Sequence, residues 1–106
     1  MCQPCEKYEK DLADKKMVKR VSLEIHGFVQ GVGFRYHSRK QAQNLDLTGF
    51  VHNVENGTVE LIAEGEEADL KKFIDWCYNG LGGAEVSKIN VSWSKATGEF
   101  SNFEIR

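Results

Sequence analysis

The spacing of apolar side chains changes several times along the chain, and these changes constrain the fold more than any other feature. Apolar and polar residues alternate over 21–26, which predicts a half-buried strand. From Phe34 to Leu45 the apolar spacing becomes helical, with Ser38 and Ala42 on the same face. The pattern then predicts, in order, a strand over 49–54, a hairpin turn at 55–57, a strand over 58–64, a helix over 66–79, a strand over 89–94 and a short strand over 102–106.

The predicted order is strand, helix, strand, strand, helix, strand, with one short strand added at the end. Two helices cannot cover both faces of a four-stranded sheet, so we expect them to lie together on one face. This arrangement is an α/β (α+β) sandwich of the ferredoxin-like βαββαβ type, with an antiparallel sheet and a short C-terminal strand. Gly80 is expected to end the second helix, and Gly82-Gly83 to break the chain before the next strand.

The length of 106 residues predicts one domain, at 18–106, preceded by a polar tail at 1–17. The tail has many charges and little apolar periodicity, so we expect it to be disordered or an appended extension. No apolar run could span a bilayer and the start lacks the apolar block of a secretory signal, which favours a cytoplasmic protein. Its 16 acidic and 14 basic residues give a net charge of −2, which argues against a strongly basic nucleic-acid surface.

The three cysteines do not predict a metal site. Cys2 and Cys5 form a Cys-x-x-Cys pair in the polar tail, but no second Cys or His pair stands at the spacing of a zinc finger. A redox dithiol normally opens a helix after a strand, which this segment does not do. A function for the pair therefore stays only an alternative. Cys77 lies at helical spacing from Leu70 and Phe73, so we expect it in the core.

The most informative segment is Gly27-Phe28-Val29-Gln30-Gly31-Val32-Gly33-Phe34-Arg35, between the first strand and the first helix. Its glycines permit backbone conformations that direct several N–H groups to one point, and the helix start adds the positive end of its dipole. Arg35 follows with a guanidinium that suits two phosphate oxygens. The segment therefore predicts an anion cradle, with a common glycine-rich turn beside a surface arginine as the alternative. The spacing fits neither a Walker loop nor a dinucleotide-binding loop.

Asn53 ends the second strand, which is joined to the first helix, so we expect it to lie close to the glycine loop. A carboxamide can orient a water through its oxygen while its NH₂ group holds another partner. The alternative is that Asn53 merely ends a strand before a turn. His37 is a weaker candidate for a general base, because a lone histidine more often lies on a helix surface. The large aromatic residues expected to pack in the interior are Trp76, Trp93 and Phe100.

Together the two segments resemble the two signatures of the acylphosphatase family. The first is the run from Ile25 to Arg35, and the second is Gly49-Phe50-Val51-His52-Asn53, followed by Gly57-Thr58-Val59 and Gly65. The ending Ser101-Asn102-Phe103-Glu104-Ile105-Arg106 is also similar to the family's usual C-terminus. The resemblance covers 18–106. His52 departs from the lysine or other long side chain that the family more often carries, but it should point to the opposite face of the strand from Asn53.

The resemblance implies a hydrolase that splits the carboxyl-phosphate bond of acyl phosphates into a carboxylate and inorganic phosphate. Arg35 matches the family's phosphate-binding arginine, and Asn53 matches the asparagine that positions the attacking water. The residues that match the phosphate-binding loop are Phe28, Val29, Gln30, Gly31, Val32, Gly33 and Phe34. Acyl phosphates are already activated, so positioning and charge stabilisation are needed more than a strong base. We expect no metal or other cofactor, no nucleic-acid or membrane partner, a monomer, and competitive inhibition by inorganic phosphate.

Two other functions known for this type of fold are less well supported. An RNA-binding module would carry aromatic side chains on the exposed face of the sheet and a basic groove beside them. The exposed strand positions expected here are mainly Ser22, Glu24, Glu60, Glu64 and Asn90. A metal-carrying domain would place its Cys pair in the loop after the first strand, where this chain has 27–35. Salt-sensitive RNA binding would favour the first alternative, and stoichiometric uptake of Cu(I) or Zn(II) the second.

Overall fold

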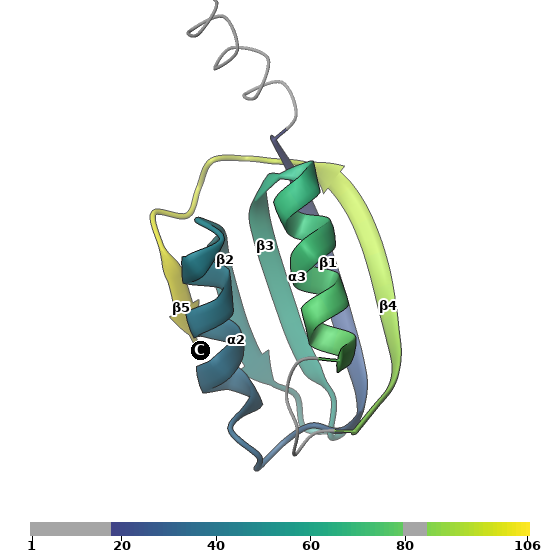
Figure 1. Ribbon diagram of the computed structural model, residues 1–106. Helices are drawn as coiled ribbons and strands as arrows, with labels where there is room; N and C mark the ends of the chain where they lie inside the picture. Colours follow the sequence, from purple (N-terminus) through teal and green to yellow (C-terminus); the bar gives the residue numbers. More distant parts are fainter. Residues whose placement is uncertain (1–17, 80–84) are drawn as a thin grey trace, which may run out of the picture.

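The computed structural model describes residues 18–79 and 85–106, which form a five-stranded sheet and two helices (Figure 1). The strands are β1 (Val18–Phe28), β2 (Thr48–Asn53), β3 (Val59–Glu66), β4 (Glu85–Lys95) and β5 (Phe103–Ile105). The helices are α2 (Phe34–Asn44) and α3 (Glu67–Asn79). Their order along the chain is the predicted one. The predicted tail with Cys2 and Cys5, and the predicted breaks at 80 and 82–83, lie outside the described residues.

The sheet runs in the order β4-β1-β3-β2-β5. The four longer strands pair antiparallel, so that Val21 of β1 lies opposite Ala63 of β3 on one side and Trp93 of β4 on the other. The short strand β5 instead pairs parallel with β2, with Gly49 opposite Phe103. The first described strand, β1, is therefore an interior strand between β4 and β3, and the last one, β5, lies at an edge.

Both helices lie on the same face of the sheet, as Figure 1 shows, and their apolar sides form the core with it. The residues that α2 buries belong to its predicted face: Phe34, Ser38 and Ala42. Those that α3 buries are Leu70, Phe73 and Cys77. Trp76 stacks on Phe73 with ring centroids 6.1 Å apart, so its predicted packing role is confirmed. Together these contacts confirm the ferredoxin-like sandwich. Neither helix of the described part is long and apolar enough to cross a membrane.

The strands β1 and β4 extend further than the alternation of the sequence predicts, because they pair with each other as far as Phe28 and Glu85. Their register shifts between His26 and Gly27. Gly27 has a φ of 131°, and a Cβ atom at this position would collide with the backbone carbonyl of Glu85. A glycine is therefore required where β4 approaches the end of β1, directly before the glycine-rich loop.

The expectation that Glu64 is exposed on the open face of the sheet is wrong, because its side chain is only 5% exposed. The segment between β4 and β5 covers it, with Thr97 N and Gly98 N donating to its carboxylate at 2.9 Å and 3.0 Å. Arg20 Nε donates to the same carboxylate at 2.7 Å. Burial would raise the pKa of Glu64, but these donors outweigh it and hold the pKa below its ordinary value.

The expectation that Trp93 packs in the interior is also wrong, since the residue is 41% exposed. Because β4 forms an edge of the sheet, part of the ring stays open to solvent. Phe100 is half-buried over the open face of the sheet. It contacts Phe50 edge to face at 5.9 Å, and the Arg20 guanidinium lies 5.3 Å from its ring centroid. Of the three predicted packing aromatics, Trp93 alone departs clearly from the expectation.

Candidate active site

The glycine-rich loop connects Phe28 at the end of β1 to Phe34 at the start of α2. Gly31 and Gly33 have φ values of 82° and 80°, in the left-handed region that favours glycine. Gly33 is the N-cap residue of α2, no side chain of the described residues caps this helix, and no acidic residue stands in its first turn. Since His37 N donates to Gly33 O at 3.0 Å, the N–H groups before His37 in the first turn have no partner within the helix. The loop therefore ends at an uncapped helix start with a partial positive charge.

Apolar side chains anchor this loop to the core. Val29 and Phe34 are only 1% and 2% exposed, and Val32 packs against the same cluster. Phe28, at the end of β1, is the exception, with 63% exposure. Because the anchoring side chains turn inward, the groups that the loop can offer to an anion are its backbone N–H groups.

Arg35 is the second residue of α2 and is half-buried. It forms no ion pair with any carboxylate in the part of the chain that the structure describes. Arg20, in contrast, contacts Glu64 and Glu99 at 2.7 Å and 2.9 Å. The charge of Arg35 is therefore not neutralised by a described acidic residue, and it adds to the positive potential of the helix start.

Asn53 is the last residue of β2 and follows two positions after Val51, whose side chain is fully buried beneath the helices. Because side chains alternate along a strand, Asn53 belongs to the helical side of the sheet. Its side-chain oxygen Oδ1 is buried and has no hydrogen-bond partner among residues 18–79 and 85–106. Such an oxygen costs about 1–3 kcal/mol unless a water or a ligand supplies the missing donor. The position therefore suits a group that binds water.

The side chain of Gln30 ties the glycine-rich loop to the turn that follows Asn53. Its Nε2 donates to the carbonyl oxygens of Val54 and Thr58, each at 2.8 Å. The turn also closes on itself, with Val54 N donating to Thr58 O at 2.9 Å. The structure thus brings the two predicted segments together at one end of the sheet. The sequence pattern predicts Gln30 only as part of the loop and misses its contact with the turn after Asn53. The signal that could have indicated this contact is that Gln30 is the single amide side chain among the apolar and glycine residues of the loop.

Two of the three histidines, His37 and His52, are close in the chain to residues of this site. His52 Nε2 lies 2.6 Å from Glu60 Oε1 on the open face of the sheet, which confirms that His52 points away from the side of Asn53. His37 is exposed on α2, and a Cβ atom placed on Gly33 would lie 3.4 Å from its ring. His37 therefore flanks the last residue of the loop.

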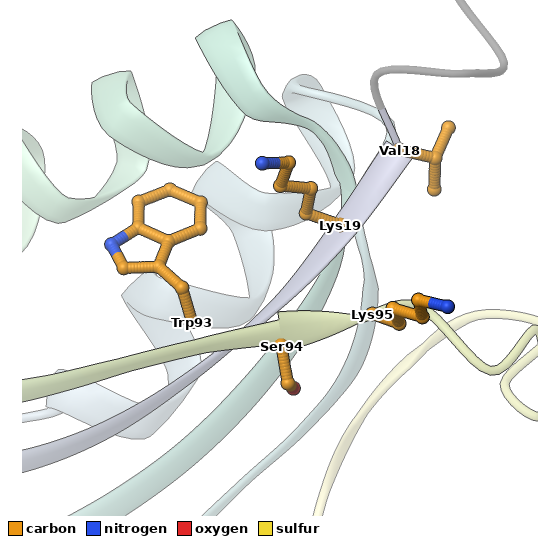
Figure 2. A pocket seen from close by; sticks show the side chains of 5 residues that line it. All are labelled: Val18, Lys19, Trp93, Ser94 and Lys95. Atoms are coloured by element: carbon orange, nitrogen blue, oxygen red, sulfur yellow. The ribbon is translucent and has the colours of Figure 1, made fainter.

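Two hollows in the described surface are lined by residues other than Arg35 and Asn53. One of about 420 Å³ lies at the opposite end of β1 from the loop, and Figure 2 shows Trp93 and Lys19 on one side of the sheet there and Ser94 on the other. The residues that line it are Val18, Lys19, Trp93, Ser94 and Lys95. A second, of about 250 Å³, lies beside the turn after Asn53. Val54 and Thr58 line it together with Glu24 and Glu60, whose charge opposes an anionic ligand. The groups of the cradle belong to the loop and the helix start, and neither of these two hollows is lined by them.

Known proteins resemble this chain over most of its length. The family model for Acylphosphatase matches residues 21–105. The chain is 44% identical to an acylphosphatase of Pelotomaculum thermopropionicum over 86 residues, which cover 81% of this chain and 94% of the relative. It is 49% identical to an acylphosphatase of Acaryochloris marina over 81 residues, which cover 76% of this chain and 86% of the relative. The crystal structure of acylphosphatase from Bacillus subtilis is similar with a TM-score of 0.80 and 36% identity, covering 85% of this chain and 99% of that one.

Proposed function

Because the chain belongs to the acylphosphatase family and is a hydrolase that acts on acyl phosphates, we propose that Arg35 and the glycine-rich loop hold the phosphoryl group while Asn53 positions the attacking water. The observation that carries the proposal is the pair of unused groups at one end of the sheet. Arg35 has no described carboxylate partner, and Asn53 Oδ1 is buried without a described donor. A phosphate and a water would supply the two missing partners.

In this mechanism the backbone N–H groups of 28–34 and the guanidinium of Arg35 bind the phosphate oxygens. Arginine suits this role because its planar fork can donate to two oxygens at once. Charge-assisted hydrogen bonds of this kind contribute about 1.5–3 kcal/mol each. Since the donors are fixed by the core and by the helix, they need little reorganisation when negative charge develops on the phosphoryl group.

Asn53 accepts a hydrogen bond from the water that attacks phosphorus. The new bond forms between the water oxygen and phosphorus, the bond between phosphorus and the acyl oxygen breaks, and the carboxylate leaves with that electron pair. A phosphate oxygen of the substrate takes the proton of the water, so the products are a carboxylate and inorganic phosphate. Because the carboxylate is a good leaving group, this route needs positioning rather than a strong protein base.

The further features of this function are proposals of the same kind. We propose metal-independent turnover, because the cradle itself supplies the positive charge that the phosphoryl group requires; the described residues also gather no group of three or more His, Cys, Asp or Glu side chains suited to a metal. Inorganic phosphate, as product, should compete with the substrate. A monomeric state, a cytoplasmic location, the absence of a nucleic-acid partner and the domain at 18–106 stay predictions from the sequence.

The direct test is release of phosphate from benzoyl phosphate by the full chain in the presence of EDTA. We expect turnover that EDTA does not reduce and that inorganic phosphate inhibits competitively. A loss of activity with EDTA that magnesium restores would contradict the metal-independent mechanism. Activity without competition by phosphate would contradict the assignment of the cradle.

A further inference from the structure

The side chain of Gln30 makes contacts outside its own loop. We propose that its side chain is a positioning residue that sets the glycine-rich loop relative to Asn53, an inference that rests on the proposed function. Its Nε2 donates to Val54 O and to Thr58 O, both at 2.8 Å. A primary amide has two N–H bonds, so both donors are used on one turn. The side chain is therefore unavailable to the phosphate and acts through the turn instead.

The two carbonyl groups lie at the base of the turn that joins β2 to β3. Val54 directly follows Asn53, and Thr58 directly precedes Val59, the residue that pairs with Asn53. The turn is closed by Val54 N donating to Thr58 O. By binding both ends of this turn, Gln30 holds the loop against the two residues that flank the Asn53–Val59 pair.

The position of Gln30 in the chain allows its contacts with the turn to fix the conformation of the loop. Its neighbour Val29 is almost completely buried, and its other neighbour, Gly31, has the left-handed φ of 82°. The backbone at Gln30 is thus fixed by the core on one side and begins the turn of the cradle on the other. The side-chain amide in addition holds this residue against the turn that follows β2.

The chemistry requires this link because the cradle and Asn53 act on the same phosphorus atom but belong to different elements. The cradle belongs to the β1–α2 connection, whereas Asn53 belongs to β2. A misplacement of about 1 Å between a bound reactant and a catalytic group can cost about 10²-fold in rate. Loss of the Gln30 contacts should therefore reduce kcat much more than the affinity of the cradle for phosphate.

The test is a double-mutant cycle with Gln30→Met, which keeps a similar length without an amide, and Asn53→Ala. With benzoyl phosphate, we expect Gln30→Met to lower kcat by about 10–10²-fold in the otherwise unchanged chain. In the Asn53→Ala background the same change should cost little, because there is no longer a positioned water to misalign. The Kd for inorganic phosphate, measured by calorimetry, should change by less than about threefold, which is under ~0.7 kcal/mol.

The matched control is Gln43→Met, which makes the same substitution at an exposed position of α2 and should leave kcat unchanged. If Gln30→Met does not fold, Gln30→Asn serves in its place, because the shorter amide cannot reach both carbonyl oxygens. The proposal is overturned if kcat is unaffected, if the loss is equally large in the Asn53→Ala background, or if it lies wholly in the Kd for phosphate. An unchanged chain that does not hydrolyse benzoyl phosphate would instead contradict the proposed function.

Discussion

Replacing Asn53 by alanine should lower turnover strongly and leave the stability of the fold nearly unchanged. Turnover of benzoyl phosphate should fall by about 10²–10³-fold, the scale for losing one preorganised polar group and equal to about 2.7–4 kcal/mol of transition-state stabilisation. The affinity for inorganic phosphate should stay nearly unchanged, because Arg35 and the loop remain whole. A residue with only a structural role would lose stability and activity together.

The small expected effect on stability follows from the side-chain oxygen of Asn53, which has no hydrogen-bond partner among the described residues. Removing it breaks no hydrogen bond within residues 18–79 and 85–106, so the loss is limited to the packing contacts of the side chain. We therefore expect the free energy of unfolding to change by less than about 1 kcal/mol. For a domain of 60–100 residues, that corresponds to a change in Tm of less than about 4–8 °C.

The assay combines steady-state turnover, phosphate calorimetry and thermal unfolding followed by circular dichroism. The control is His52→Ala, next to Asn53 but on the open face, where its contact with Glu60 is partly exposed. A partly exposed ion pair contributes about 0–1 kcal/mol, so this variant should lose little stability and no turnover. A folded Asn53→Ala protein with near-normal turnover would remove Asn53 from the mechanism, while a Tm that falls by many degrees would refute the reasoning from its unpaired oxygen.

Three further outcomes are expected. Arg35→Lys keeps the charge but loses the two-pronged geometry, so the Kd for phosphate should rise about 10–150-fold, from the loss of about 1.5–3 kcal/mol; an unchanged Kd in calorimetry would exclude Arg35 from the cradle. Inorganic phosphate at 100 times its Kd should stabilise the fold by about 2.7 kcal/mol, and a Tm that does not respond to phosphate would count against the site. Glu64→Gln should lower the free energy of unfolding at pH 7 by about 1.5–3 kcal/mol. Because the pKa of Glu64 is lowered by folding, its contribution is present above the unfolded pKa and disappears as the pH falls through the folded pKa. Denaturant unfolding should therefore show the two proteins converging at low pH, and a constant difference down to pH 2 would contradict this assignment.

The sequence predicts the elements well because their apolar spacing is local information. Alternation over 21–26 and helical spacing from Phe34 to Leu45 identify β1 and α2, and both glycines of the loop take the left-handed backbone that their residue type permits. The location of the candidate site can be predicted from the same elements, since the C-terminal ends of β1 and β2 lie at the same end of the sheet.

The departures arise where distant segments decide the environment. The period of β3 places Glu64 on the open face, but only the path of the chain between β4 and β5 buries it under Thr97 and Gly98. Trp93 is exposed because β4 is an edge strand, a property of the whole sheet. The contacts of the Gln30 side chain with Val54 and Thr58 likewise depend on the packing of two connections far apart in sequence.

The position of β1 between β3 and β4 has a consequence for how the protein is made. Val21 needs Ala63 on one side and Trp93 on the other, so one edge of β1 stays unpaired until β4 has been synthesised and docked. Contacts between strands this far apart in sequence form slowly, because the entropy of the intervening chain is lost before the contacts form. During that interval the unpaired edge of β1 exposes N–H and C=O groups that can pair with strands of other nascent chains and lead to aggregation.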